Sequence, residues 1–206
     1  MALLTPTRRP RSGAASRHVP VRAFATTLGA HLELESGLEH DLFRLLDRDA
    51  NVTCLAAQPF QLAWRTSGRK PLRRHTPDLL SVDSSGMVTV WDVKREVLAE
   101  ADSFILDREV TEQACREVGW AYEVFTGLPP VHRHNLLWLH AYRRPPTCLA
   151  ERSEQLLREC TLGPTLGALF ARVSDEDRAL LWHMIWSGQI MVDLTARLGP
   201  ESLVVV

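Results

Sequence analysis

Several features that mark well-known classes of protein are missing from this sequence. No apolar run approaches the length of about 20 residues that a helix needs to cross a bilayer, which excludes a membrane span. P-loop, GxGxxG and GxSxG motifs, which mark phosphate-binding loops and nucleophilic serines, are also absent. Cysteine is scarce, and the four cysteines form no CxxC pair that would indicate a zinc cage or a disulfide framework. We therefore expect a protein of the reducing cytoplasm.

Acidic residues are missing from residues 1–32, although the net charge of the whole chain is only −1. Prolines at positions 6, 10 and 20 interrupt any helix in this stretch. We expect a flexible basic arm that contacts DNA phosphates, and the alternative is a solvated tail with no partner. An organelle transit peptide is less well supported, because the prolines break the amphipathic helix that it requires. The arm contains five arginines, namely Arg8, Arg9, Arg11, Arg17 and Arg22.

Length and composition suit one medium domain, or one domain with a small appendage. The chain has 206 residues, of which 45% are apolar and 24% are charged, as in ordinary folded proteins. Apolar periodicity indicates an α/β (α+β) fold in which helices cover the faces of a mixed sheet. The predicted elements are a helix over 36–48, strands over 53–57 and 60–64, a β-hairpin over 75–94, a helix over 102–118, a strand over 120–125 and a helix over 132–142.

A domain boundary is indicated by the dipeptides Arg143-Arg144 and Pro145-Pro146. Beyond it the pattern predicts three helices, and Ser174 with Asp177 provides an N-cap for the third. Two apolar strands close the chain, and three helices followed by a two-stranded ribbon are the outline of a winged helix. The helices are expected near 149–160, 165–172 and 175–187, and the strands over 189–194 and 202–206. The resulting division is the arm at 1–32, a core at 33–145 and a small winged-helix-like domain at 148–206.

Three charged side chains converge in the predicted hairpin. Asp92 and Lys94 are two residues apart on one strand, so their side chains emerge on the same face. Asp78 follows Pro77 on the partner strand, and a hairpin brings facing residues within about 5 Å of each other. Two neighbouring carboxylates repel each other unless a cation lies between them, and Mg²⁺ prefers oxygen ligands. The sequence therefore predicts a Mg²⁺ site, and Mn²⁺ would satisfy the same oxygens.

A metal at this position can activate water and stabilise the charge that grows on a scissile phosphate. Lys94 would orient or help to deprotonate the attacking water and would offset phosphate charge. This division of labour is the chemistry of the PD…DxK pattern. The alternative is that Asp92 and Lys94 form a surface ion pair, because short motifs recur by chance. Lysine is almost absent from the chain, with Lys70 and Lys94 its only two, which argues against coincidence.

Glu39 supplies a further carboxylate from the first predicted helix. On a helical wheel Glu39 lies at the inward edge of the leucine stripe, whereas Asp41 and Asp47 fall on the opposite, solvated side. A buried carboxylate needs a cation or hydrogen bonds, and a metal shared with the hairpin acids would meet that need. The alternative is a capping box, in which Glu39 bonds back to the N-terminus of its helix. Glu35 is the substitute acid if the helix begins earlier.

A basic, turn-prone stretch leads directly into the hairpin. Its side chains can grip the DNA backbone, which supplies position and affinity without sequence specificity. The alternative is a loop that is merely well solvated. The candidate DNA-binding residues are Arg69, Lys70, Arg73 and Arg74.

Four short segments carry a resemblance to a known family. In order and spacing they resemble the TnsA family of transposase endonuclease subunits, and the similarity continues through Gly119–Phe125 and Asn135–Leu139. It covers about residues 33–145, and the C-terminal part resembles the small winged-helix domain of the family more loosely. The four segments are Ser36-Gly37-Leu38-Glu39, Gln58-Pro59-Phe60, His75-Thr76-Pro77-Asp78 and Trp91-Asp92-Val93-Lys94.

The resemblance implies a restriction-endonuclease-like core that cuts DNA with a bound metal. Glu39 and Asp78 match the metal-binding acids of the family, Asp92 matches a residue at the metal, and Lys94 matches the catalytic lysine. The family enzyme cuts the 5′ strand at transposon ends, while a separate DDE-type transposase subunit processes the 3′ strand and an ATPase regulates both. It has little DNA specificity of its own and little activity without its partner.

Two other functions remain open. One is a standalone defence or repair nuclease that uses the same core and cuts DNA without a partner. The other is a catalytically silent adaptor whose winged helix binds DNA or protein. The adaptor needs no metal site, so the complete set of two acids and a lysine in the hairpin argues against it.

Overall fold

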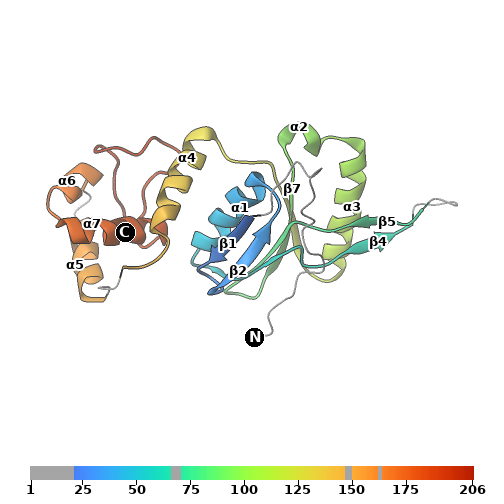
Figure 1. The fold of residues 1–206 in the computed structure, drawn as a ribbon, viewed down its shortest axis with the longest axis horizontal. Coiled ribbons are helices and arrows are strands. Elements are labelled where there is room, and N and C mark those ends of the chain that lie inside the picture. The colour runs from blue at the N-terminus through green and yellow to red at the C-terminus, as the bar shows by residue number, and fades with distance from the viewer. Residues whose placement is uncertain (1–20, 66–70, 147–149, 162–163) are drawn as a thin grey trace. The chain divides into compact units, whose positions relative to one another are not determined.

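The computed structural model describes residues 21–65, 71–146, 150–161 and 164–206. The chain divides into two compact units (Figure 1). The first comprises residues up to Asp47 together with Asn51–Gly127, and the second comprises Arg48–Ala50 together with Leu128–Val206. The predicted boundary at 143–146 therefore lies inside the second unit.

The first unit contains a four-stranded sheet, and the prediction of a mixed sheet is confirmed. The order of its strands is β3-β6-β7-β8, in which β3 pairs antiparallel with β6, β6 antiparallel with β7, and β7 parallel with β8. Parallel pairing of β7 with β8 requires a crossover, and helix α3 provides it. The strands are β3 (Val52–Ala57), β6 (Leu79–Asp83), β7 (Val88–Val93) and β8 (Ala121–Phe125), and α3 spans Asp102–Glu117.

The predicted hairpin is confirmed in β6 and β7, although its first strand begins at Leu79 and not at His75. Asp83 closes its turn. The Asp83 carboxylate accepts hydrogen bonds from the backbone N–H groups of Ser85, at 2.8 Å, and Met87, at 3.0 Å. Gly86 adopts a φ of +87°, which a residue without a Cβ reaches at no steric cost. This turn fixes the register of the two strands that carry the acidic side chains.

Helices cover both faces of the sheet, and in Figure 1 strand β7 lies between α1 and α3. Helix α1 (Gly37–Arg48) buries Leu42 and Phe43 in one apolar cluster with Leu79 of β6. On the other face, Cys115 of α3 belongs to a second cluster with Leu80. Because Leu79 and Leu80 are adjacent in β6, the two clusters lie on opposite faces. This arrangement confirms the predicted mixed sheet with a helix on each face.

A β-hairpin that the sequence analysis missed precedes α1. Strands β1 (Val21–Ala25) and β2 (Ala30–Leu34) pair antiparallel, and their inward residues join the apolar cluster of α1. The prediction of a flexible arm is therefore wrong for residues 21–32, and residues 1–20 lie outside the described ranges. The apolar alternation in these two strands is short, and two of its four buried positions are small alanines. The pattern was therefore weaker than the basic composition, which favoured an arm. The buried residues are Ala23, Ala25, Leu32 and Leu34.

The expected exposure of two acids in α1 is wrong. Asp41 and Asp47 were expected in solvent, but they are only 2% and 5% exposed. Asp47 accepts hydrogen bonds from the Thr26 hydroxyl at 2.8 Å and the Thr27 backbone N–H at 3.0 Å, so it holds the turn of the hairpin. Asp41 accepts a hydrogen bond from Arg44 at 3.0 Å. Their burial is compensated by these partners.

A separate two-stranded sheet and a short helix complete the first unit. Strand β4 (Leu62–Trp64) pairs antiparallel with β5 (Arg73–His75), so the strand predicted over 60–64 does not join the main sheet. Helix α2 (Glu96–Ala99) follows β7 directly and was not predicted.

The second unit is mainly helical within the described ranges. The predicted helix over 132–142 is confirmed as α4 with a terminal 3₁₀ turn, and the N-cap predicted at Ser174 is confirmed by its hydroxyl, which accepts the Asp177 backbone N–H at 3.2 Å. No helix in the described part of the chain has the length and apolar character needed to span a bilayer. The helices are α4 (Pro130–Leu139), η1 (His140–Tyr142), α5 (Ala150–Cys160), α6 (Leu166–Phe170) and α7 (Asp175–Trp186).

The two strands predicted at the C-terminus are wrong as continuous strands. Only isolated bridges form there among the described residues, between Met191 and Val205 and between Thr165 and Leu203. The Asp193 carboxylate accepts a hydrogen bond from the Thr195 backbone N–H at 2.8 Å. This local bond ends the first extended run. Local side-chain bonds of this kind compete with a β-ladder for the backbone.

Candidate active site

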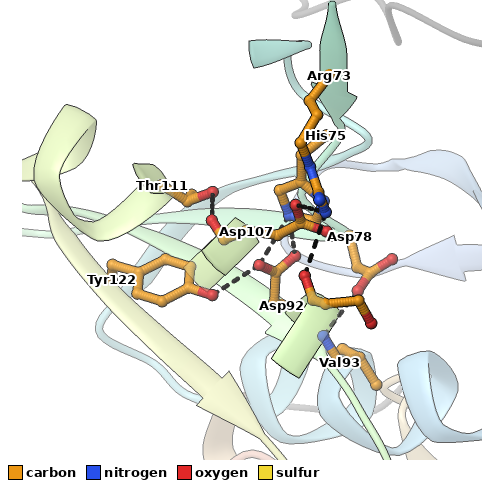
Figure 2. A network of polar contacts seen from close by, with 9 residues as sticks. Arg73, His75, Asp78, Asp92, Val93, Asp107, Thr111 and Tyr122 are labelled. Atoms are coloured by element: carbon orange, nitrogen blue, oxygen red, sulfur yellow. Dashed lines mark hydrogen bonds and ion pairs between the residues drawn. The ribbon is translucent and has the colours of Figure 1, made fainter. Parts of the chain in front are cut away.

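Asp78 and Asp92 lie opposite each other at the end of the β6–β7 hairpin. Leu79 pairs with Trp91, so one step further along the same register Asp78 faces Asp92. The Asp78 backbone N–H donates to the Trp91 carbonyl at 3.0 Å, and the Val93 backbone N–H donates to Asp78 Oδ2 at 2.7 Å. Figure 2 shows the two carboxyl groups in one network. The structure thus brings these two predicted site residues together.

Lys94 follows Asp92 by two residues, directly after the end of β7. Its backbone N–H donates to the Phe125 carbonyl at 3.0 Å, which extends the pairing of β7 with β8 beyond Val93. Its Nζ atom lies 5.2 Å from the centre of the Phe104 ring, a distance at which a cation is attracted to the ring face. The positive charge of Lys94 acts on Asp78 and lowers the pKa of that carboxyl group. Lys94 therefore belongs to the same electrostatic site.

Glu39 reaches this site from α1 and also caps the helix. Its Oε2 atom accepts the Glu35 backbone N–H at 2.8 Å, while its own backbone N–H donates to the Ser36 hydroxyl at 3.1 Å. The capping interaction considered from the sequence is therefore present, with Glu35 in place of Ser36 as the backbone donor. Glu39 is only 6% exposed, and its negative charge raises the pKa of Asp78. Capping and proximity to the hairpin acids occur together.

The pKa of Asp78 is raised by its burial and by the negative charges around it. Burial and then the charge of Glu39 raise the pKa of Asp78 to about 7, and Asp92 adds to the effect. The Val93 N–H and the Lys94 charge act in the opposite direction, but they are too weak to offset it. Close carboxylates that resist ionisation are the environment in which a bound cation is most stabilising.

The donor set has the chemistry of a site for a hard divalent cation. Carboxylate oxygens from adjacent strands and a third carboxylate nearby are ligands that Mg²⁺ prefers. Within the ranges that the structure describes, no three His, Cys, Asp or Glu side chains are already grouped around one metal position. Glu39 and Asp92 are instead held by hydrogen bonds to protein groups. The residues present fit the ion if one oxygen of each acid turns to it.

The sequence analysis missed the two partners of Asp92. Asp92 is fully buried, and His75 Nε2 lies 2.9 Å from its Oδ1 and 2.8 Å from its Oδ2. The Tyr122 hydroxyl donates to Oδ2 at 2.6 Å (Figure 2). Burial lowers the pKa of His75, but the hydrogen bond and charge of Asp92, with Asp107 and Asp78, raise it overall. The cationic form of His75 is favoured beside these acids.

Tyr122 becomes a partner of Asp92 through the parallel pairing of β8 with β7. Tyr122 pairs with Val90, two residues before Asp92, so Tyr122 and Asp92 lie on the same face of adjacent strands. The predicted strand over 120–125 contained this residue, but its partner and register are not determined by local sequence. In the sequence, the only signal at His75 is its place at the start of the segment that ends in Asp78.

The four candidate DNA-binding residues have different surroundings. Arg69 and Lys70 lie outside the described residues. Arg73 donates to Asp107 at 2.8 Å and to the Ser103 carbonyl at 3.3 Å, so its guanidinium is bound within the protein. Arg74 is exposed. Alternation along β5 therefore directs Arg73 towards α3, whereas the neighbouring Arg74 remains available to a phosphate.

The second unit has a pocket of different character. Its volume is about 460 Å³, and aromatic side chains, including Trp138, Phe170 and Trp182, form much of its wall. Arg197 also lines it, and no carboxylate does among the residues that the structure describes. The acids that were predicted to hold a metal lie in the first unit instead.

Comparison with known proteins does not assign a family. No protein-family model matches the chain, and no curated protein shows a significant match. The functional argument therefore depends on the geometry of the site and on the pattern of residues in the sequence.

Proposed function

We propose that this protein is a divalent-metal-dependent DNA endonuclease of the PD-(D/E)xK type. The observation that carries the proposal is the register of the β6–β7 hairpin, which sets Asp78 opposite Asp92 with Lys94 two residues further on. Glu39 of α1 adds a third carboxylate, close enough to raise the pKa of Asp78. Two acids and a lysine at one end of a hairpin, with a helix glutamate, are the residues that such a nuclease uses.

Each side chain has a role that follows from its position. Asp78, Asp92 and Glu39 would hold Mg²⁺ or Mn²⁺ through their oxygens. The bound ion supplies an activated water and stabilises charge on the scissile phosphate. Lys94 offsets phosphate charge and orients the attacking water from the same strand. Arg74 is exposed and provides a contact for the DNA backbone.

The order of elements supports a restriction-endonuclease-like core. Helix α1, strands β3, β6 and β7, helix α3 and strand β8 follow one another in that order, apart from the small β4–β5 sheet and α2. The hairpin carries the acids and the lysine, and the preceding helix carries the glutamate. Helices α5, α6 and α7, followed by a single bridge between Met191 and Val205, support a winged-helix-like C-terminal domain.

We further propose that the nuclease is a TnsA-like subunit of a heteromeric transposase. The support is the series of segments that contain the four predicted site residues. Glu39 lies in α1, Asp78 directly before β6, Asp92 in β7 and Lys94 directly after β7. In this role the protein would cut the 5′ strand at transposon ends, together with a DDE-type transposase subunit and a regulatory ATPase. A standalone nuclease would have the same site and would differ in cutting DNA without a partner.

Cleavage of labelled transposon-end DNA tests this proposal. The wild-type protein is expected to cut the 5′ strand with Mg²⁺ or Mn²⁺ when the cognate transposase is present. Lys94→Ala is expected to lose at least about 100-fold in rate. Glu112→Gln is the control, because Glu112 is an exposed acid of α3 that pairs only with Arg116 in the described contacts. Cutting without the transposase favours the standalone nuclease, and no cutting under either condition refutes the endonuclease.

A further inference from the structure

Asp92 is held by hydrogen-bond donors from two different sheets. It has no exposed surface, and two donors from different strands meet its two oxygens. Tyr122 comes from β8 of the main sheet, and His75 comes from β5 of the separate two-stranded sheet. Neither residue is needed for the register of the β6–β7 hairpin, which the Asp83 turn already determines. The pair of donors therefore acts on the carboxylate itself.

The hydrogen bonds divide unequally between the two oxygens of Asp92. Oδ2 accepts from the Tyr122 hydroxyl and lies 2.8 Å from His75 Nε2, whereas among the described contacts Oδ1 has only His75, at 2.9 Å. An ionised carboxylate has about four lone-pair positions. Oδ1 therefore keeps more capacity for a further partner than Oδ2 does. Tyr122 fixes which oxygen remains available.

Both donors are themselves anchored by neighbouring elements. Tyr122 is fixed by the parallel pairing of β8 with β7, in which it faces Val90. His75 is fixed through β5, because Arg73 on the same face of that strand bonds to Asp107 and to the Ser103 carbonyl of α3. The His75 side chain is 12% exposed, so little solvent competes for its ring nitrogen. The Asp92 carboxylate thus lies between side chains that other elements of the first unit hold in place (Figure 2).

We propose that His75 and Tyr122 are positioning residues of the nuclease site, which orient Asp92 so that Oδ1 is available to the metal beside Asp78. The inference rests on the proposed function and specifies how the site is aligned. Neither residue contacts the reacting phosphate, and both act through Asp92. Partners of this kind that hold a ligand typically change metal affinity or activity by 10-fold to 100-fold when they are removed.

Mn²⁺ affinity of the full chain, measured by calorimetry, is the first test. Tyr122→Phe removes one hydroxyl without removing the ring, and His75→Gln removes the imidazole. Each variant is expected to bind Mn²⁺ about 10-fold more weakly than the wild type. Tyr142→Phe removes the hydroxyl of the only other tyrosine and is expected to bind Mn²⁺ with wild-type affinity.

A double-mutant cycle distinguishes positioning from a general loss of structure. If Tyr122 acts through Asp92, Tyr122→Phe has no further effect on Mn²⁺ affinity when Asp92→Asn is already present. Unchanged affinity in both single variants, or a full additional loss in the double variant, overturns the inference while leaving the metal nuclease intact. A wild-type protein that binds no Mn²⁺ overturns the proposed function, and this inference with it.

A measurement on the unmutated protein does not depend on the folding of any variant. The ring nitrogens of His75 can be followed by NMR while Mg²⁺ is added. Because His75 lies within 2.9 Å of both Asp92 oxygens, an ion on Oδ1 is expected to shift the Nε2 resonance. Mg²⁺ that saturates the protein without shifting this resonance overturns the inference.

Discussion

Replacing Asp78 with Asn is expected to make the metal-free protein more stable. In the folded protein, burial and the charges of Glu39 and Asp92 raise the pKa of Asp78 from 3.8 to about 7. At pH values where Asp78 is ionised in the unfolded chain, the raised pKa therefore lowers the free energy of unfolding. The Asn side chain has no charge, and its carbonyl oxygen can still accept the Val93 N–H that Asp78 accepts at 2.7 Å. The variant thus keeps the contact and removes the penalty.

The magnitude follows from the two pKa values. One pKa unit corresponds to about 1.4 kcal/mol, so a rise from 3.8 to about 7 corresponds to about 4 kcal/mol at most. Asp78 is partly exposed, so relaxation and solvent reduce this, and we expect a gain of about 2 kcal/mol at pH 7. For a chain of this size such a gain raises Tm by roughly 4–8 °C.

The sign of the pH dependence is specific. A carboxyl group whose pKa is raised by folding causes stability to fall as pH rises from its unfolded pKa to its folded pKa. The advantage of Asp78→Asn should therefore be small near pH 4, grow up to about pH 7 and stay constant above it. Asp83→Asn in the same hairpin is the control with the opposite sign, because hydrogen bonds from Ser85 lower the pKa of Asp83.

Thermal unfolding in EDTA between pH 4 and pH 8 measures these differences. Added Mg²⁺ should then stabilise the wild type, through binding to the folded state, and have little effect on Asp78→Asn. The reasoning is refuted if Asp78→Asn is no more stable than the wild type at pH 7, or if its advantage does not increase with pH.

Three further predictions concern other parts of the molecule. Asp177→Asn should destabilise the protein in thermal unfolding at neutral pH, and less so near pH 3. The hydrogen bond from Arg152 lowers the pKa of Asp177, so the stability that it provides is lost as pH falls. An equal loss of stability at both pH values would contradict this. Gly167→Ala should lower the free energy of unfolding by about 1–3 kcal/mol, because the new Cβ would lie 2.9 Å from the Cβ of Pro200. Chemical unfolding measures this, and an unchanged midpoint would show that the contact relaxes freely. Arg74→Ala should weaken DNA binding in a salt-dependent titration without lowering Tm, and unchanged affinity at low salt would remove Arg74 from the DNA surface.

The hairpin and the helix before it could be predicted because their signals are local. The turn from Asp83 to Gly86 determines the register, and the register alone sets Asp78 opposite Asp92. The inward direction of Glu39 followed from helical spacing, and its burial agrees with that prediction. These are properties of consecutive residues, which a single sequence contains.

The remaining features depend on contacts between distant segments. The partners of Asp92 come from 17 and 30 residues away, through β5 and through a parallel strand whose register the sequence does not specify. Asp47 was assigned to solvent because the hairpin that buries it begins more than 20 residues earlier. At the C-terminus, the apolar runs favoured strands, but the local bond from Thr195 to Asp193 interrupts them.

The most direct test of the central claim is 5′-strand nicking of a supercoiled plasmid that carries the transposon ends, by the purified protein with Mn²⁺ in the presence of the cognate transposase. Wild type, Asp78→Asn and the control Glu112→Gln should be compared at equal concentration. The account predicts 5′-strand nicking by wild type and control that EDTA abolishes, and none by Asp78→Asn even though this variant is the more stable protein. Nicking by Asp78→Asn at the wild-type rate, or no nicking by any of the three, would contradict a metal-dependent nuclease at this site.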